Sequence, residues 1–123
     1  YNKNMAVVTK RKLSGSTDGH PILVVATATP GTTIHTAVAG TTAGTFDEIW
    51  LYAYNGHTTT VTLTIEFGGA TVPDQNIVST LASKSGSILI VPGYILQNSL
   101  VVKAFGSVAS VVTLTGWVNA ITD

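Results

Sequence analysis

The clearest alternation of hydrophobic and polar positions lies between Phe46 and Gly69, which reads FDEIWLYAYNGHTTTVTLTIEFGG. In its second half, apolar residues alternate with threonines and one glutamate. A period of two is that of a β-strand with one buried and one solvated face. The apolar positions are Val61, Leu63, Ile65 and Phe67, and the polar positions are Thr60, Thr62, Thr64 and Glu66.

The first half of this stretch is apolar on both faces. One face carries the aliphatic residues Ile49, Leu51 and Ala53. The other face is aromatic, interrupted by one acid, and carries Phe46, Glu48, Trp50, Tyr52 and Tyr54. A strand that is apolar on both faces must be covered on both, by its own chain or by another. What covers the aromatic side is therefore the main question about function.

The dipeptide Asn55-Gly56 separates the two halves. Asn-Gly between alternating runs is a strong hairpin signal, because both residues of a type I′ turn must tolerate positive φ. We therefore expect residues 46–69 to form a β-hairpin.

The rest of the chain also predicts short strands and no helix. Turn-forming Gly, Pro, Asp and Ser residues separate β-branched runs, and no window shows a sustained period of 3.6 residues. The further strands that we expect are 6–13, 22–28, 32–38, 77–81, 88–91, 100–105 and 109–121.

Two details of these strands concern proline and glycine. The run that begins at Ile88 is expected to stop at Pro92-Gly93, and a turn is expected around residues 97–99. Gly116 lies inside the last strand, where a glycine indicates a bulge or a close approach of two backbones.

This spacing of strands and turns is typical of an all-β fold. We expect a single-domain, jelly-roll-like β-sandwich of about eight or nine short antiparallel strands, with little or no helix. Residues 1–13 are expected to form an N-terminal arm or edge strand, and residues 14–123 to form the sandwich.

Composition narrows the possible functions. Charged residues make up 10% of the chain, with six acidic and six basic side chains, against roughly 25% charged residues in ordinary domains. Zero net charge disfavours general binding to nucleic acid or to an anionic membrane. No apolar run approaches the roughly 18 residues of a membrane span. A weakly charged, threonine-rich surface instead favours association with other protein subunits.

Residues that could support catalysis do not form a recognisable motif. Glu48 and Glu66 lie on the two arms of the expected hairpin and could face each other or lie diagonally, whereas a glycosidase pair needs two acids about 5 to 10 Å apart in a cleft. His20, His35 and His57 have no metal-binding spacing. The chain has no cysteine, no GxSxG motif, no P-loop and no GxGxxG motif. We therefore expect no catalytic residue, cofactor, metal or small-molecule substrate.

Basic residues gather near the N-terminus: Lys3, Lys10, Arg11 and Lys12 are four of the six in the chain. Such a run can belong to a solvated edge strand, where lysine discourages unwanted pairing. It can also belong to an arm that contacts an acidic neighbour. The sequence leaves both interpretations open.

Several stretches resemble small virion structural proteins of tailed bacteriophages. They are KLSGSTDGHPI (12–22), TATPGTTIHTA (27–37), FDEIWLYAYN (46–55), TLTIEFGG (62–69), and LVVKAF (100–105) with GWVNAI (116–121). The resemblance implies a non-enzymatic capsid decoration (cement) protein. Such proteins are commonly small β-rich domains, often trimers at local threefold axes, whose terminal arms clamp neighbouring capsid proteins.

The resemblance also implies partners and a location. The partners would be further copies of the chain, as a homotrimer, and a major capsid protein. The location would be the capsid surface of the virion, after synthesis in the host cytoplasm. We expect the shell contact at Lys3, Lys10, Arg11 and Lys12, and the subunit contact at Phe46, Trp50, Tyr52 and Tyr54.

Two other functions remain open at this point. The chain could be a head–tail or tail component of the same kind of virion. It could also be a carbohydrate-binding β-sandwich that uses the aromatic residues as a stacking platform, which requires exposed, coplanar rings.

Overall fold

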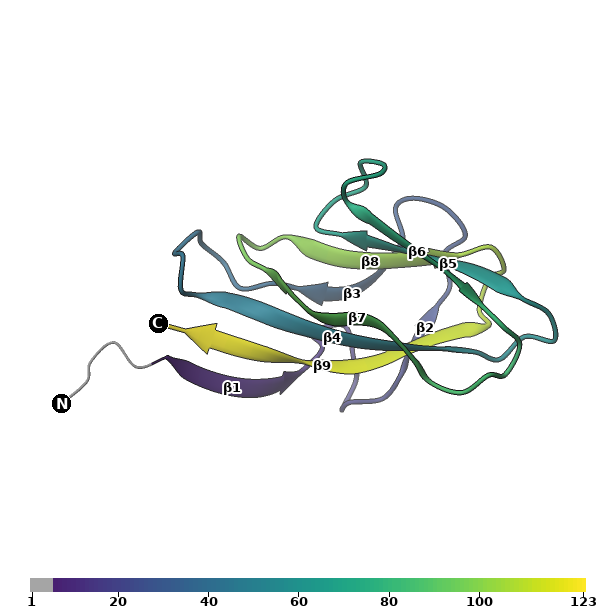
Figure 1. The fold of residues 1–123 in the computed structure, drawn as a ribbon, viewed down its shortest axis with the longest axis horizontal. Helices are drawn as coiled ribbons and strands as arrows, with labels where there is room; N and C mark the ends of the chain where they lie inside the picture. Colours follow the sequence, from purple (N-terminus) through teal and green to yellow (C-terminus); the bar gives the residue numbers. More distant parts are fainter. Residues whose placement is uncertain (1–5) are drawn as a thin grey trace.

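The computed structural model describes residues 6–123, and all regular structure in this range is β-strand (Figure 1). The described residues include no helix that is long and apolar enough to cross a membrane. The strands are β1 (Val7–Lys12), β2 (Ile22–Val24), β3 (Thr32–Thr36), β4 (Phe46–Asn55), β5 (Val61–Phe67), β6 (Asn76–Leu81), β7 (Ile88–Leu96), β8 (Val101–Gly106) and β9 (Val112–Thr122).

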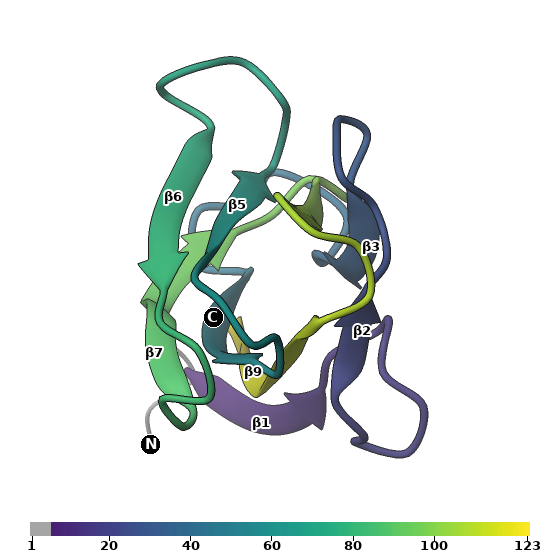
Figure 2. The same ribbon diagram turned by 90° about the vertical axis from the view of Figure 1, so that its right-hand side faces the viewer.

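These strands form two antiparallel sheets that face each other (Figure 2). The first sheet has the order β1-β9-β4-β7, and β2 also pairs with β9. The second sheet has the order β3-β8-β5-β6. Because β1 and β2 pair with successive parts of β9, they act as one interrupted edge strand. With these two counted as one, the order is that of a jelly roll. The expected jelly-roll-like sandwich is confirmed.

The inner faces of both sheets form one hydrophobic core. The alternation that predicted β5 is confirmed, since Val61, Leu63 and Ile65 are fully buried. Other fully buried side chains come from both sheets and from a connecting loop, and they include Leu13, Val24, Ile34, Ile49, Leu51, Val91, Val102 and Leu114. This shared core keeps the two sheets in a fixed relation.

The expected β4–β5 hairpin is wrong. β4 lies in the first sheet and β5 in the second, so the segment between them crosses from one sheet to the other. The buried side chain of Asn55 shapes this crossing: its amide donates to the carbonyls of Thr59 and Leu81, and its oxygen accepts the amide hydrogen of His57. Neither Asn55 nor Gly56 is among the residues with positive φ, which a type I′ turn would need.

The expected end of a strand at Pro92-Gly93 is also wrong, because β7 continues through both residues to Leu96. β7 is an edge strand, where the missing amide hydrogen of a proline is tolerated. Its pairing with β4 shifts register at Gly93 and again at Ile90, and Gly93 adopts a φ of 77°. The turn predicted around residues 97–99 follows, with Asn98 and Ser99 at positive φ.

Gly116 marks a close approach of two backbones, as its position in the sequence indicated. It lies in β9, opposite Leu51 of β4. A Cβ atom at this position would collide with the backbone carbonyl oxygen of Trp50. The missing side chain therefore lets β4 and β9 approach each other.

Candidate interaction surface

An aromatic cluster occupies the outer face of the first sheet. Trp50 of β4 lies directly opposite Trp117 of β9 in the strand register. Their ring centroids are 5.9 Å apart, with 14° between the planes. The ring of Tyr52 also lies 5.9 Å from Trp117, at 29°. Offset stacking at such separations is a favourable aromatic geometry. The three half-buried rings therefore form one unit.

Lys10 of β1 extends this cluster. Its ammonium nitrogen lies 4.6 Å from the centroid of the Trp117 ring, within the range of a cation–π interaction. Because β9 lies between β1 and β4, Lys10 and the β4 rings approach Trp117 from opposite sides. The basic stretch and the aromatic residues, which the sequence presented as separate features, thus share one continuous surface.

Glu48 adds a negative charge to the same face. One of its carboxylate oxygens accepts hydrogen bonds from the Asn119 amide at 3.0 Å and from the Trp50 indole N–H at 2.8 Å. These two bonds hold the pKa of Glu48 below its ordinary value, and the bond from Asn119 has the larger effect. Burial acts in the opposite direction and has the smallest effect of the three. Donors that bond the ionised form favour it. Glu48 therefore remains ionised through mildly acidic pH.

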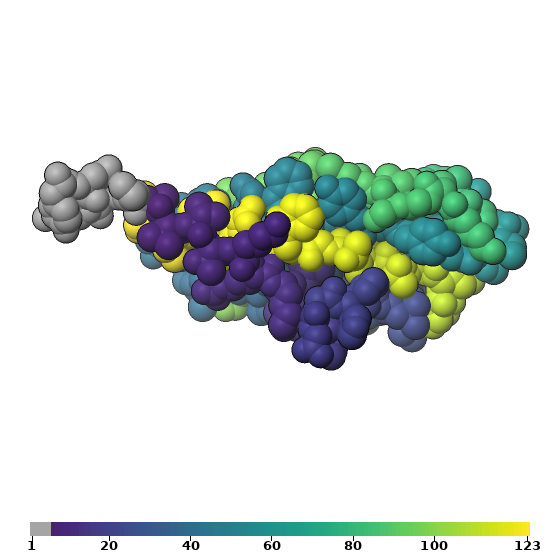
Figure 3. Space-filling model, turned by 90° about the horizontal axis from the view of Figure 1, so that it is seen from below, coloured from purple at the N-terminus to yellow at the C-terminus, as the bar shows by residue number. Residues whose placement is uncertain are grey.

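Nothing in the described chain covers this surface. The face seen in Figure 3 shows β1 in purple, β9 in yellow and β4 in teal, side by side. Tyr54 is 38% exposed, and Phe46 is half-buried. Apolar residues of the flanking strands, Val8 and Ile95, are 60% and 56% exposed. The aromatic side of β4 is therefore not part of this chain's own core.

The predicted interface residues divide by strand face. Lys10 and Lys12 of β1 are in register with outward residues of β9. Arg11 alternates to the inner face, and Lys3 lies outside the described residues. The outer face therefore brings together Lys10, Lys12, Phe46, Trp50, Tyr52 and Tyr54.

Two members of the surface were missed from the sequence, Trp117 and Asn119. A signal was present, because in β9 the apolar residues Val112, Leu114 and Val118 alternate with positions of the other face. Extending that alternation places Trp117 and Asn119 on the outer face.

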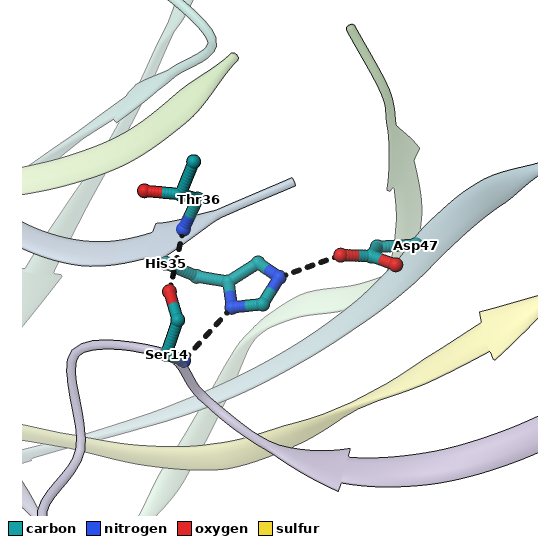
Figure 4. A network of polar contacts seen from close by, with 4 residues as sticks. All are labelled: Ser14, His35, Thr36 and Asp47. Atoms are coloured by element: carbon teal, nitrogen blue, oxygen red, sulfur yellow. Dashed lines mark hydrogen bonds and ion pairs between the residues drawn. The ribbon is translucent and has the colours of Figure 1, made fainter. Parts of the chain in front are cut away.

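A cleft of about 570 Å³ lies on the inner side of β1. Arg11 lines it, together with a polar network that links the two sheets and in which His35 and Asp47 are buried (Figure 4). The Nδ1 atom of His35 accepts the backbone N–H of Ser14 at 3.0 Å, so Nε2 carries the proton and donates to Asp47 at 2.7 Å. The Ser14 hydroxyl accepts the backbone N–H of Thr36 at 2.7 Å.

This network contains Ser, His and Asp but is not arranged as a catalytic triad. In a triad the imidazole takes the proton of the serine hydroxyl. Here the backbone N–H of Ser14 donates to the Nδ1 atom of His35, and the Ser14 hydroxyl bonds to the backbone N–H of Thr36 instead of to the imidazole. The contacts instead join β3, β4 and the loop after β1.

The expectation that Glu48 and Glu66 could face each other is wrong, because they lie on different sheets. Glu66 is buried beside a pocket of about 280 Å³. Its two oxygens accept hydrogen bonds from the Thr29 hydroxyl and the Gly31 amide, each at 2.6 Å. This carboxylate therefore holds the β2–β3 loop against the second sheet.

The histidines occupy separate sites: His20 in a loop, His35 in β3 and His57 in the β4–β5 crossing. Within residues 6–123 no group of three or more His, Asp or Glu side chains is placed to hold a metal ion.

The ring geometry does not suit a flat platform for sugars. Nearly parallel rings whose centroids are 5.9 Å apart overlap in part, since coplanar neighbours would collide at that separation. Trp117 is also contacted from both sides, by Lys10 and by the β4 rings.

Comparison with known proteins adds no relative: no family model, curated protein or solved structure matches this chain.

Proposed function

We propose that this chain is a non-enzymatic virion structural protein, a decoration (cement) protein that stabilises an assembled phage head. The main support is the uncovered outer face of the first sheet, where Trp50, Tyr52 and Trp117 stack beside Lys10. Contiguous exposed apolar area marks interaction sites. Jelly-roll sandwiches are, in addition, a common architecture of capsid proteins.

The residue types on this face suit a protein partner. Tryptophan and tyrosine are enriched among the residues that dominate binding energy at interfaces. The stack is already ordered in the single chain, so burying it costs little side-chain entropy. Many modest contacts repeated over a shell would then stabilise it through multivalency.

The partners in this proposal are further copies of the chain, as a homotrimer, and a major capsid protein. Trp50, Tyr52 and Tyr54 would contact the neighbouring copy, and Lys10 and Lys12 would contact an acidic part of the shell. The protein would then be located at the capsid surface.

The test is binding to heads assembled without this chain. Purified chain is added, and occupancy is measured by sedimentation and by imaging of the particles. The variant W50A/Y52A should lose occupancy, whereas T62A/T80A, a matched pair of alanine substitutions on β5 and β6, should keep it. Circular dichroism checks that both variants are folded.

Each other result has a defined meaning. Equal occupancy of both variants would exclude the aromatic face as the contact. Failure of the unmodified chain to bind heads would contradict the decoration function. Images that place the chain at the neck or tail would favour a head–tail or tail component instead.

A further inference from the structure

β1 is an unusually open edge strand. All six of its residues are exposed, Val7 and Val8 at 57% and 60%. It pairs with β9 on one side, and no described strand pairs with its other side. Below it, the inner side chain of Arg11 lines the open cleft rather than the core. The free edge thus presents backbone donors and acceptors to which another strand could bond.

The edge also carries unneutralised positive charge. Lys10, Arg11 and Lys12 are consecutive. Within residues 6–123 no carboxylate lies within ion-pair distance of any of these three cations; the His35–Asp47 contact, at 2.7 Å, is the hydrogen bond of a neutral imidazole described above. Alternation sends Lys10 and Lys12 to the outer face and Arg11 to the inner face. An added strand would therefore meet positive charge on both of its faces.

Protection of the edge does not fully account for these charges. β6 is one of the two edge strands of the second sheet and has the same length as β1, six residues, yet its sequence NIVSTL has no charged residue. If lysine were needed only to prevent unwanted pairing, β6 would need it as well. The difference between the two edges points to a partner that is specific for β1.

A second copy of β1 is a poor partner for this edge. Antiparallel pairing of two copies would bring two basic triplets into one short ladder, and like charges across a ladder are destabilising. An acidic strand would instead place carboxylates near Lys10 and Lys12 on one face and near Arg11 on the other.

We propose that the free edge of β1 binds an extended acidic segment of a partner protein by strand addition. Backbone hydrogen bonds would supply the affinity, and consecutive acidic side chains, which lie in turn on the two faces of the added strand, would supply the specificity. The inference rests on the proposed function only in taking the partner to be another virion protein.

The test uses the full chain and a short synthetic peptide with three consecutive glutamates flanked by threonines, so that its carboxylates lie on both faces of the added strand. Binding is followed by fluorescence polarisation of the labelled peptide, and β1 is followed by amide hydrogen exchange. The β1 amides that do not bond to β9 should gain protection in the complex. A peptide with lysine in place of glutamate should not bind, and neither should an acidic peptide with proline at alternate positions.

Matched variants of the chain test the role of charge. K10Q/K12Q and K84Q/K103Q remove the same charge from different places. The first should weaken binding of the acidic peptide roughly tenfold, as expected for the loss of two or more exposed charge contacts. The second should leave it unchanged.

Three results would overturn strand addition at β1: equal binding of the proline-containing peptide, unchanged exchange of the β1 amides, or equal weakening by both variants. Because the peptide assay contains no capsid, it separates the two proposals. Peptide binding without binding to heads would contradict the decoration function alone. Binding to heads without peptide binding would contradict the strand addition alone.

Discussion

β4 and β5 follow one another in the chain, and each has a neighbouring strand on both sides, yet their outer faces differ. Their inner faces are equivalent, since Leu51 of β4 and Leu63 of β5 are both fully buried. On the outer side β4 presents Trp50 and Tyr52, whereas β5 presents threonines. The alternating apolar residues of the inner face thus place each strand in the core. The residues of the outer face can therefore differ between the two strands, and those of β4 can form a contact with another protein.

The acidic residues of the two strands show the same difference. Glu66 of β5 bonds to a loop of its own chain and is 3% exposed. Glu48 of β4 bonds to neighbours on an open surface. The second sheet uses its outer carboxylate to hold the fold, and the first sheet leaves its carboxylate available to a partner.

The largest expected effects concern the shared inner face. L51A and L63A should each lower the free energy of unfolding by about 2–5 kcal/mol, through lost burial and the cavity left behind. Denaturant titration measures both. A much smaller loss for one variant would show that the two inner faces are not equivalent.

The two carboxylates should differ next. E66A removes the acceptor of two hydrogen bonds in a buried site and should cost about 2–3 kcal/mol. E48A, on the exposed face, should change the free energy of unfolding by less than about 1 kcal/mol. The same denaturant titration compares them, and equal losses would remove this distinction between the two outer faces.

The outer faces themselves should differ more in binding than in stability. W50A should cost about 1 kcal/mol, because it removes a stack with Trp117 on a half-open surface. T62A on β5 should cost less than about 0.5 kcal/mol. Near-ultraviolet circular dichroism should change for W50A and not for T62A. A severe loss of stability in W50A would indicate that the ring is a core residue.

The smallest effect is the pH dependence of Glu48. Its pKa is lowered in the folded chain, so its contribution to stability is present above its ordinary pKa and is lost as pH falls through the lower folded value. An NMR titration should show the lowered midpoint. N119A removes the hydrogen bond that contributes most to lowering the pKa of Glu48, so the titration midpoint should move upward. An unchanged midpoint in N119A would contradict this assignment.

Much of the fold was predictable because alternation is a local signal. The residues that face the core from β5 follow directly from it, as does the two-sided character of β4. The hairpin was wrong because Asn55 bonds to Leu81 of β6, a contact that no local pattern reveals. The end expected at Pro92 was wrong because only the sheet order shows that β7 is an edge strand.

The surface was only partly predictable for the same reason. The aromatic residues of β4 could be identified from their own strand. Their stacking on Trp117 and the approach of Lys10 depend on which strands become neighbours, which is a property of the whole sheet. Two separate sequence features therefore proved to be adjacent.

The absence of a side chain at Gly116 affects the spacing of the aromatic rings on the opposite face of the sheet. Gly116 faces the interior, one residue away from the paired indoles, and it allows β4 and β9 to lie close together there. A methyl group there would widen the strand spacing and separate the rings. A survey limited to solvent-facing positions would overlook the residue that sets the geometry of the exposed stack.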